Sequence, residues 1–530
     1  MVKFVIHLNR LLLPLLFALL LVSAQAVQAN RAQPTAVEDI TIMNLSNTPT
    51  SSVDPFLIAD RTGVAHLFWS EDVGGRVVMG GTAAGNTIMY ARWDGVSWSQ
   101  ANDILLTPLD PTAFEDPKAW QPEAIIDDYG AIHLIWLGQY PDKLYYSSAL
   151  AAEADQAQAW SVPFALTNDS TGTQYSIDIE YLSATQTVHI VYARGHWEEQ
   201  YAGEDPRAIT HLFSTDGGKT WSDPVDIAFT PDPERGYSNV RLLAVPEDRL
   251  FASWTEWDQT GNGQAVWVVR SLDNGRTWDA PVKLAQRLEG EYERDWTKLT
   301  WLGGDQLLAT WEGGFRAYRH FMYSDDAGQT WSEPLDTFYW LIGENGFVEF
   351  ARDSADNLHF FIAQRIREGT IGRTGGEGLW HSTWQGEREW SDTQLVGGPN
   401  GMVNPRVAVA GGNNLVATWY NSAVGEIIVL TGRLRGVSAI PPQTWIEKET
   451  AVTPNETTTS SPSATLTDAP NLVESDPSLD LATIPFLAPS SLGSAIWVSM
   501  MPVVTLLGVF LLIRYSQSHR NGRNPKNKYK

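Results

Sequence analysis

The residues best suited to chemistry are charged side chains that recur along the middle of the chain, each a few residues ahead of an apolar run. They are Asp54, Glu123, Arg241, Lys298, Glu349 and Arg406. Planar guanidinium groups pair with carboxylates in bidentate fashion. A site lined by this mixture of charges favours a hydroxyl-rich or charged ligand over an apolar one. We therefore treat these six residues as candidate site residues.

Two tryptophans extend this set. Trp197 lies in the predicted loop 196–199, beside two acidic residues, and Trp257 follows another apolar run. Indole rings that reach the surface would give an aromatic face on which sugars can lie. Simple packing of both indoles is the alternative.

Seven apolar stretches must position the candidate residues. Each alternates with the period of two that is typical of a strand, and all except 188–192 follow one of the six candidate residues. They cover residues 65–69, 132–136, 188–192, 250–254, 307–311, 358–361 and 415–419. We interpret them as the second strands of the blades of a β-propeller. The candidate residues then fall on the first strands, which line the central channel.

Three turn segments share the pattern Ser-x-Asp-x-Gly-x-Thr-Trp. The Gly tolerates positive φ, the Asp carboxylate accepts N–H bonds from the turn, and the Trp covers the turn. We predict a structural role for Ser214, Asp216, Gly218, Trp221, Ser271, Asp273, Gly275, Trp278, Ser324, Asp326, Gly328 and Trp331. The pattern resembles the Asp box, or BNR repeat, of the sialidase-like β-propeller superfamily.

The repeats predict an all-β propeller of seven four-stranded blades. Six Trp endings, at Trp98, Trp160, Trp221, Trp278, Trp331 and Trp390, recur at roughly 50 to 60 residues, which suits four strands per blade. The seventh unit ends near Leu434 without an outer strand. We expect residues 39–45 to supply that strand and to close the ring, which would remove its open edges. Six blades, the number in sialidases, is the alternative.

The resemblance also implies a chemistry to compare with this sequence. A sialidase of this superfamily would bind a sialic acid carboxylate with three Arg side chains and use a Tyr–Glu nucleophile and an Asp acid/base. The Phe-Arg-Ile-Pro segment of the family is absent, because residues 53–57 read Val-Asp-Pro-Phe-Leu. The first Arg therefore has no counterpart. If the protein is a hydrolase, the catalytic candidates are Arg241, Arg406, Tyr237, Glu123 and Asp54; strand-end salt bridges and core packing are the alternatives for the arginines and the tyrosine.

Composition argues against several other kinds of site. The chain has no cysteine, which excludes disulfides, thiolate metal sites and a Cys nucleophile. Its net charge of −25 argues against a nucleic-acid partner. Four histidines recur at one repeat position, His66, His133, His189 and His359. Equivalent positions in different blades are too far apart to share an ion, so we predict that these histidines satisfy backbone groups. No metal or cofactor is expected.

The two ends predict an exported membrane protein. Residues 1–29 read as a signal peptide, which leaves 30–435 as the propeller. Residues 436–491 are rich in Thr, Ser and Pro and predict a disordered stalk. Residues 492–513 are uncharged, apolar and long enough to span a bilayer, and the basic segment 514–530 is expected on the cytoplasmic side. The propeller is then extracellular and held by one helix.

Three functions are consistent with the sequence. The favoured hypothesis is a membrane-anchored extracellular module that recognises a glycan or a protein through one face of the propeller, since the catalytic signature is incomplete. The alternative is an anchored exo-sialidase or related glycoside hydrolase, and a third is a structural protein of the cell envelope. Fold alone does not decide among them. The ligand, the oligomeric state, bound calcium and cleavage of the stalk stay open.

Overall fold

Strands make up nearly all of the regular structure. The computed structural model describes residues 36–48, 51–71, 87–108, 118–138, 143–167, 173–194, 207–314, 318–342, 347–363, 366–367, 378–398 and 402–447. Within these ranges the only helices are two short 3-10 turns, η1 (Ala151–Glu153) and η2 (Ala157–Ala159), and neither could cross a membrane. The expected signal peptide, transmembrane helix and cytoplasmic tail lie outside the described residues, as does the stalk beyond residue 447.

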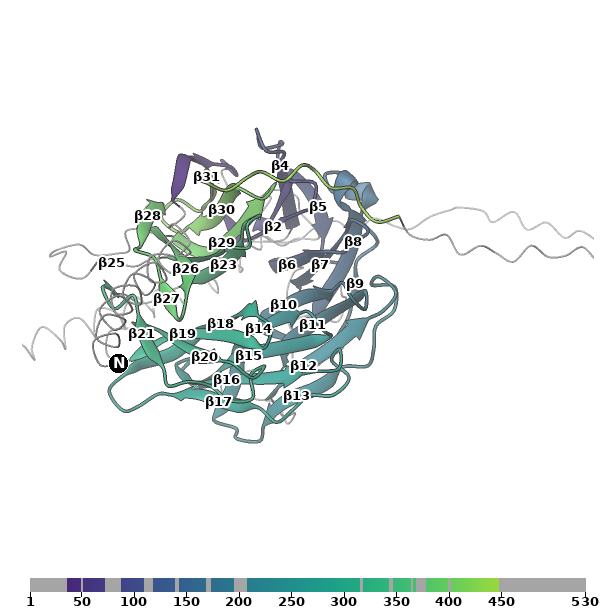
Figure 1. Cartoon of the computed structure of the whole chain (residues 1–530). Coiled ribbons are helices and arrows are strands. Elements are labelled where there is room, and N and C mark those ends of the chain that lie inside the picture. The colour runs from purple at the N-terminus through teal and green to yellow at the C-terminus, as the bar shows by residue number, and fades with distance from the viewer. Residues whose placement is uncertain are drawn as a thin grey trace, which may run out of the picture. The chain divides into compact units, whose positions relative to one another are not determined.

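The strands form seven antiparallel blades (Figure 1). Blade 1 contains β2 (Ser52–Ala59), β3 (Ala65–Glu71), β4 (Thr87–Trp93) and β5 (Asn102–Leu106). Blade 2 contains β6 (Trp120–Ile126), β7 (Ala131–Leu137), β8 (Leu144–Leu150) and β9 (Phe164–Ala165). Blade 3 contains β10 (Thr173–Leu182), β11 (Thr187–Arg194), β12 (Arg207–Ser214) and β13 (Val225–Thr230). Blade 4 contains β14 (Arg235–Val245), β15 (Arg249–Asp258), β16 (Gly263–Ser271) and β17 (Val282–Gln286).

The remaining three blades continue in chain order. Blade 5 contains β18 (Tyr292–Gly303), β19 (Gln306–Gly314), β20 (Tyr318–Ser324) and β21 (Leu335–Thr337). Blade 6 contains β23 (Val348–Arg352), β24 (Leu358–Ile362), β26 (Leu379–Gly386) and β28 (Gln394–Gly397), with the short β27 (Glu389–Trp390) also paired to β26. Blade 7 contains β29 (Met402–Ala410), β30 (Asn414–Asn421), β31 (Glu426–Leu434) and β1 (Val37–Asn44). A separate two-stranded sheet pairs β22 (Leu341–Ile342) with β25 (Ile366–Arg367).

The blades close into a ring. Each first strand contacts the next, in the order β2, β6, β10, β14, β18, β23 and β29, and β29 contacts β2 again (Figure 1). β1 pairs with β31, so that Ile42 lies opposite Leu430 and Met43 opposite Val429. The prediction of seven blades closed by the N-terminal strand is confirmed, and the six-bladed alternative is wrong. Closure by strand pairing joins the two ends of the domain without a disulfide.

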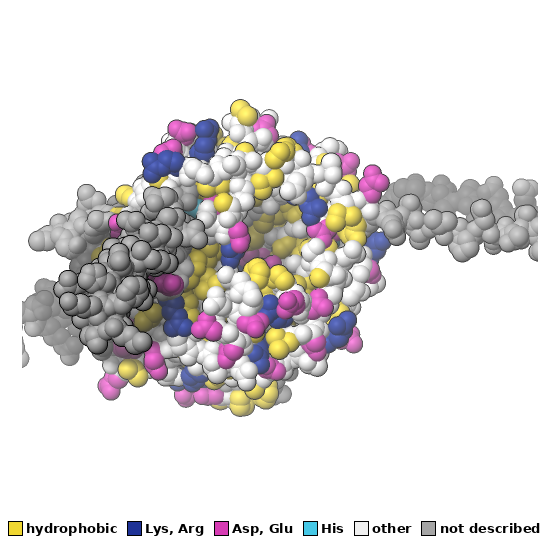
Figure 2. Space-filling model, viewed as in Figure 1, with side chains coloured by type: hydrophobic (Ala, Val, Ile, Leu, Met, Phe, Trp, Pro, Cys, Tyr) yellow, Lys and Arg dark blue, Asp and Glu magenta, His cyan; other side chains and the backbone are white. Residues whose placement is uncertain are grey.

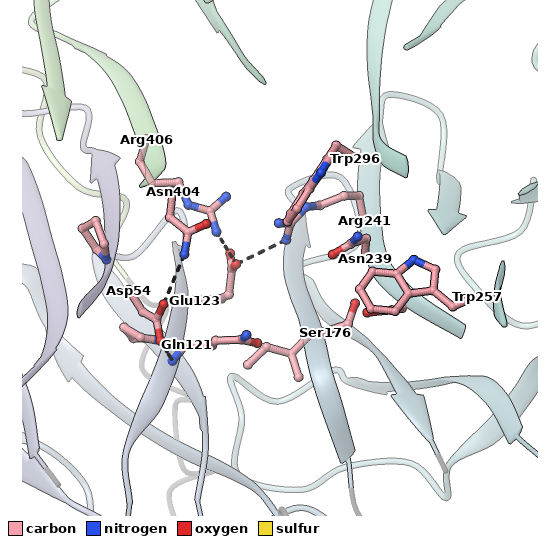
Figure 3. Close-up of a pocket in the computed structure, with 14 residues that line it drawn as sticks. Asp54, Gln121, Glu123, Ser176, Asn239, Arg241, Trp257, Trp296, Asn404 and Arg406 are labelled. Atoms are coloured by element: carbon pink, nitrogen blue, oxygen red, sulfur yellow. Dashed lines mark hydrogen bonds and ion pairs between the residues drawn. The ribbon is translucent and has the colours of Figure 1, made fainter. Parts of the chain in front are cut away.

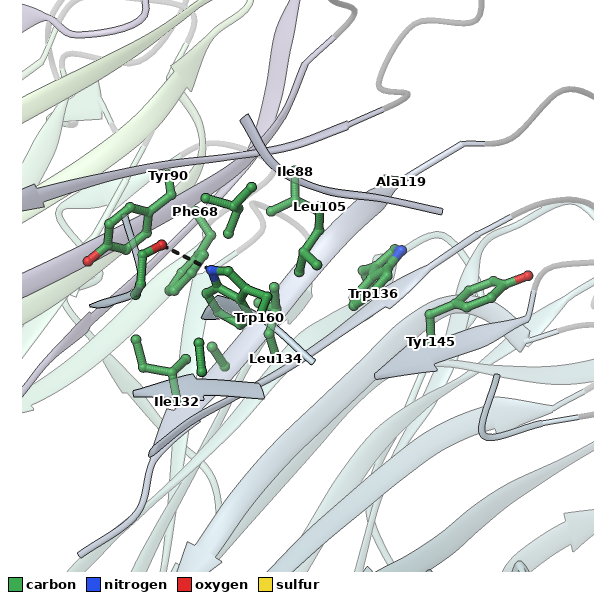
Figure 4. Close-up of a cluster of buried hydrophobic side chains, with 14 of the residues drawn as sticks. Phe68, Ile88, Tyr90, Leu105, Ala119, Ile132, Leu134, Trp136, Tyr145 and Trp160 are labelled. Atoms are coloured by element: carbon green, nitrogen blue, oxygen red, sulfur yellow. Dashed lines mark hydrogen bonds between the residues drawn. The ribbon is translucent and has the colours of Figure 1, made fainter. Parts of the chain in front are cut away.

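The hydrophobic core lies between neighbouring blades. Figure 4 shows one such layer, in which Phe68 of blade 1 lies beside Leu134 and Trp160 of blade 2. A large aromatic residue near the end of the second strand recurs in five blades and is buried in each: Trp69, Trp136, Trp254, Trp311 and Trp419. Burying an indole removes more apolar surface from water than any other side chain does. These tryptophans therefore hold the first strands in place around the channel.

Each Asp box is a hydrogen-bonded corner between the third and fourth strands. In blade 3, Ser214 Oγ lies 2.9 Å from Asp216 Oδ1 and accepts the Gly218 N–H at 2.9 Å. The Asp216 carboxylate also accepts the Thr220 N–H at 2.9 Å and its hydroxyl at 2.6 Å. The same pattern recurs around Asp273 in blade 4 and Asp326 in blade 5. The Asp carboxylate thus accepts backbone N–H groups of the turn that have no partner in a neighbouring strand.

The corners also join each blade to the blade before it. The Trp221 indole lies edge-on to the Tyr146 ring of blade 2, with ring centroids 5.2 Å apart. A Cβ on Gly218, which has a φ of 81°, would lie 1.8 Å from the Tyr146 hydroxyl. His211 of blade 3 makes the equivalent contacts with Trp278 and Gly275 of blade 4. The box glycine therefore supplies both the backbone conformation and the space for the neighbouring ring.

The recurring histidines bond to side chains, which corrects the expectation of backbone partners. His66 Nδ1 lies 2.7 Å from the Tyr90 hydroxyl, and His66 Nε2 lies 3.2 Å from Asp60. Blade 2 repeats this arrangement with His133, Tyr146 and Asp127. In blades 3 and 6 a second histidine replaces the tyrosine, in the pairs His189–His211 and His359–His381. Each pair is a buried polar link between the second and third strands.

The chain stays packed against the ring for twelve residues beyond the expected boundary at 435. The Ile440 N–H donates to Gly411 O at 2.8 Å, and the Ile446 N–H donates to Asp128 O at 3.1 Å. Trp445 lies beside Gly130 and under the Arg61 guanidinium, 5.4 Å from the ring centroid. We call residues 435–447 the strap. The strap crosses turns that follow the C-terminal ends of first strands, so it lies at the end of the channel where those strands finish.

Candidate functional site

One register position on the first strand of every blade carries the charged candidates. In each blade the residue at this position pairs with an equivalent residue of the second strand. The second-strand partners, in blade order, are Phe68, Ile135, Val191, Ser253, Thr310, Phe361 and Thr418. The seven first-strand residues are Phe56, Glu123, Asp178, Arg241, Lys298, Glu349 and Arg406. We call them the channel ring. Six are charged, three of each sign, so the fully ionised ring carries no net charge.

A β-bulge precedes the ring position in five blades. Two residues ahead of it, a non-glycine residue adopts a positive φ: Asp54 (52°), Gln121 (49°), Asn239 (51°), Trp296 (52°) and Asn404 (48°). The pairing register shifts at the same place in each of these strands. An extra residue bends a strand and re-aims the side chains around it, and such strain concentrates at functional sites. The bulges bring both the bulge residue and the ring residue to the channel.

The ring residues form a chain of ion pairs across the channel (Figure 3). Glu123 Oε1 lies 2.6 Å from Arg406 Nη2 and 3.3 Å from Arg241 Nη1. The other Arg406 nitrogen, Nη1, lies 3.2 Å from Glu349 Oε1, and Lys298 binds Glu349 Oε2. Each guanidinium therefore reaches a carboxylate on a different blade. Five blades contribute to one continuous network.

The network borders a cavity of about 320 Å³. Its walls are Asp54, Pro55, Gln121, Pro122, Glu123, Ser176, Ile177, Ser238, Asn239, Arg241, Trp257, Trp296, Asn404 and Arg406. Figure 3 shows Trp257, Trp296 and Arg241 on one side of this space and Asp54, Asn404 and Arg406 on the other. A narrower space of about 30 Å³ adjoins it, beside Lys298 and Glu349. In Figure 2 acidic, basic and hydrophobic side chains lie close together around the central hollow.

The bulge residues are held by hydrogen bonds between blades. Asn404 Nδ2 donates to Asp54 Oδ1 at 3.1 Å, and the Gln121 N–H donates to Asp54 Oδ2 at 3.4 Å. On the opposite side, Asn239 Nδ2 donates to the buried Asp295 carboxylate at 2.5 Å. The conformation of the cavity wall is therefore fixed without a ligand, as in most small-molecule sites.

Two carboxyl groups of the channel ring have opposite titration behaviour. Burial raises the pKa of Glu123 to about 7, against the lowering effect of Arg406 and Arg241. Burial also opposes ionisation of Glu349, but Lys298 and Arg406 hold the pKa of Glu349 below its usual range. Glu349 is therefore charged at neutral pH, whereas Glu123 exchanges a proton there.

Other acidic groups near the cavity are also perturbed. Burial, with the charge of Asp178, raises the pKa of Glu180, two residues further along β10, to about 8. Burial raises the pKa of Asp54 as well, and it raises the pKa of Asp295 to about 7. Several carboxyl groups with raised pKa values in one cleft are a common feature of functional sites. None of the described residues forms a His, Asp and Glu cluster able to hold a metal ion.

The structure brings most of the candidate residues together. Asp54, Glu123, Arg241, Arg406 and Trp257 line the cavity, and Lys298 and Glu349 line its narrow extension. Tyr237 does not line either space; it is buried in the core of blade 4, with its ring 5.7 Å from that of Trp254. Trp197 lies outside the described residues.

Sequence reasoning missed Asn239 and Trp296, which line the cavity. A weak signal was present. Asp54, Gln121 and Asn404 each precede a proline, and each lies two residues before a channel-ring residue. Counting back two residues from Arg241 and Lys298 gives Asn239 and Trp296. The repeat of that offset marks the bulge.

Comparisons with known proteins find the same repeat and two similar sialidases. The chain matches the BNR/Asp-box repeat at residues 212–223 and 322–333. It is 22% identical over 254 residues to a sialidase of Paraclostridium sordellii, which covers 43% of this chain and 61% of that protein. It is 24% identical over 216 residues to a sialidase of Clostridium perfringens, which covers 37% of this chain and 55% of that protein. The chain thus spans less than two thirds of either relative.

A solved structure of a Hadza microbial sialidase is also similar, with a TM-score of 0.43 and 12% identity over 77% of this chain and 96% of that one. The structure has three Asp-box corners and seven blades of antiparallel strands, and the sequence matches the BNR repeat. The protein is a seven-bladed β-propeller that carries BNR/Asp-box repeats, and part of its sequence is similar to sialidases.

Proposed function

We propose that the protein binds a carbohydrate in the channel cavity. The observation that carries this proposal is the convergence of guanidinium, carboxyl, amide and indole groups from several blades on one space of about 320 Å³. This volume is at the lower end of the range for small-molecule sites, so it suits one or two sugar units. Arg241, Asn239 and Asn404 offer hydrogen bonds to hydroxyl groups, while the faces of Trp257 and Trp296 suit the apolar side of a sugar ring.

The relatives give independent support for a sugar ligand, because both curated relatives bear the name sialidase. A second candidate function is glycoside hydrolysis in the same cavity. It is favoured by Glu123, whose pKa of about 7 suits a group that delivers and accepts a proton near neutral pH. It is disfavoured by the position of Tyr237, which is packed in the core. Binding without turnover is therefore our leading proposal.

We also propose that the propeller is displayed outside the cell on a single C-terminal membrane helix. The supports are the signal-like segment 1–29, the apolar segment 492–513 and the basic segment 514–530. Protease added to intact cells should then remove the propeller and spare an epitope tag fused after Lys530. A propeller that resists protease until the cells are lysed would contradict this location.

The test of the carbohydrate proposal is a glycan array, followed by a fluorogenic sialoside assay on the same protein. We expect array binding that is lost in Arg241→Ala, because this change removes a cavity cation that is partly exposed and bonded to Glu123. Arg388→Ala is the matched control, since Arg388 pairs with Asp325 at an exposed Asp-box corner away from the channel. Hydrolysis of the sialoside that Arg241→Ala abolishes would favour the enzyme instead. Binding that both variants retain would refute the cavity as the site.

A further inference from the structure

We infer that Glu123 determines whether the cavity accepts neutral or acidic sugars, by competing with a ligand carboxylate for Arg241 and Arg406. This inference rests on the carbohydrate function proposed above and adds a charge-selecting residue to it. With Glu123 ionised, the cavity takes neutral, hydroxyl-rich sugars. With Glu123 protonated, it takes sugars that carry a carboxylate.

The geometry places Glu123 where a ligand anion would bind. Both cations of the cavity, Arg241 and Arg406, contact the same atom, Glu123 Oε1, at 3.3 and 2.6 Å. They come from blades 4 and 7, on two sides of the cavity, and Glu123 comes from blade 2 between them (Figure 3). A carboxylate held between two guanidiniums is the arrangement that would bind an acidic ligand. Here the protein supplies that carboxylate itself.

Charge balance gives the competition its direction. The fully ionised channel ring has three cations and three carboxylates, so a ligand anion would enter a neutral ring and meet the charge of Glu123. A proton on Glu123 Oε2 leaves Oε1 as a neutral acceptor and gives the ring a net charge of one positive unit. Arg241 then has no anionic partner among the described residues other than an incoming ligand. The pKa of about 7 places this change near neutral pH.

Other charged groups face Glu123 and set its surroundings. They are Arg406 on β29, Arg241 on β14, Lys298 on β18, Asp178 and Glu180 on β10, Asp54 on β2 and, through Arg406, Glu349 on β23. Glu180 is another carboxyl group of the channel whose charge changes near neutral pH, and in the described part of the chain it forms no ion pair with either arginine. The variant Glu180→Gln is therefore the matched control. It removes a titrating channel carboxyl and leaves the Arg–Glu–Arg contact in place.

The test compares methyl galactopyranoside with methyl galactopyranosiduronic acid, the neutral and the acidic form of one methyl glycoside, as ligands of the full-length protein at pH 8.5 and 5.5. A sugar carboxyl titrates near pH 3.5, so the probe itself stays ionised. The fraction of protein with neutral Glu123 rises from about 3% to about 97%, and the apparent affinity for the uronate should rise about 30-fold. Binding of the neutral probe should change less than about 3-fold. Glu123→Gln should bind the uronate equally at both pH values, and Glu180→Gln should keep the pH dependence.

A second measurement needs no variant. Calorimetry of uronate binding at pH 8 in buffers of different ionisation enthalpy should show uptake of about one proton per ligand. Sugar binding without charge selectivity or proton uptake would overturn the inference and leave the proposed function standing. Loss of the pH dependence in Glu180→Gln rather than Glu123→Gln would also overturn it. Failure of both probes and of the glycan array at both pH values would refute the proposed function and this inference together.

Discussion

Replacing His211 by tyrosine should make the propeller more resistant to acid. His211 pairs with His189 at 3.1 Å in blade 3, at the register position that Tyr90 and Tyr146 occupy in blades 1 and 2. Burial, together with the neighbouring His189, lowers the pKa of His211 to about 3. His211→Tyr therefore inserts a group that the repeat already accommodates, beside Gly275 as Tyr146 lies beside Gly218. The variant removes a buried group that resists protonation.

The expected magnitude follows from proton linkage. An unfolded histidine titrates near pH 6.5, so between pH 6.5 and about 3 the unfolded chain binds one more proton at this position than the folded chain does. The contribution of the neutral His211 is fully present above pH 6.5. It is lost as the pH falls, by about 1.4 kcal/mol per pH unit. Between pH 7.5 and 4.5 the wild type should lose about 2–3 kcal/mol that His211→Tyr retains.

Urea unfolding followed by tryptophan fluorescence at several pH values measures this difference. His211→Phe is the control: it also cannot titrate, but it leaves His189 Nδ1 without its partner, at a cost of about 1–3 kcal/mol that does not depend on pH. Both variants keep the buried His189, so they should show the same pH slope, less steep than that of the wild type, and differ by a constant offset. A His211→Tyr protein that loses stability as steeply as the wild type would refute the neutral buried histidine. A loss well above 2 kcal/mol at pH 7.5 would refute the equivalence of the two register positions.

Three further substitutions test the corners and the strap. Gly218→Ala should destabilise the fold by several kcal/mol more than Gly95→Ala, because both glycines have positive φ but only Gly218 faces a ring, that of Tyr146; equal losses in denaturant midpoints would contradict that contact. Asp326→Ala should cost about 1–2 kcal/mol in the same assay, since it removes a turn acceptor, and Asp326→Asn should cost less. Trp445→Ala should cost about 1–2 kcal/mol from lost apolar and cation–π contact, and an unchanged midpoint would show that the strap adds no stability.

The number of blades was predictable because it depends on patterns that repeat in the sequence. Each second strand is an apolar run in the sequence because nearly all of its residues are buried between neighbouring blades. The closing strand was predictable for a different reason. The last unit lacks an outer strand, and an apolar segment without a partner lies at the other end of the domain, where Ile42 now pairs opposite Leu430.

The candidate site was predictable only in part, because a bulge changes the alternation of side chains. Tyr237, Asn239 and Arg241 would share one face of a regular strand, which is why Tyr237 and Arg241 were both expected at the channel. The positive φ at Asn239 inserts one residue, so Tyr237 turns into the core and Ser238 lines the cavity. An asparagine or tryptophan in a strand does not by itself predict a positive φ. The sequence of a single strand therefore does not reveal the bulge.

The described chain continues to contact the ring beyond the predicted boundary at residue 435, and composition does not reveal this. The segment after it is rich in polar residues, and its average composition predicts disorder. Packing, however, depends on individual side chains rather than on averages. Val437 reaches the core cluster of blade 7, and Trp445 packs beside Gly130. Two apolar anchors spaced along a short segment are enough to hold it when the turns beneath offer backbone hydrogen bonds.

The channel ring shows how this scaffold separates its fold from its ligand specificity. The bulges and the buried tryptophans fix the backbone of the first strand in blades 1, 2, 4, 5 and 7, so the ring side chain has no role in strand pairing there. One position can therefore hold Phe56 in blade 1, a carboxylate in blade 2 and a guanidinium in blade 4 at little cost to the sheet. The charges must instead balance one another around the channel, since an unpaired buried charge is costly. A ring that is neutral when fully ionised satisfies this constraint. Glu123 is held between two arginines, and its pKa is about 7. A charged ligand can therefore alter the charge balance of the ring at Glu123.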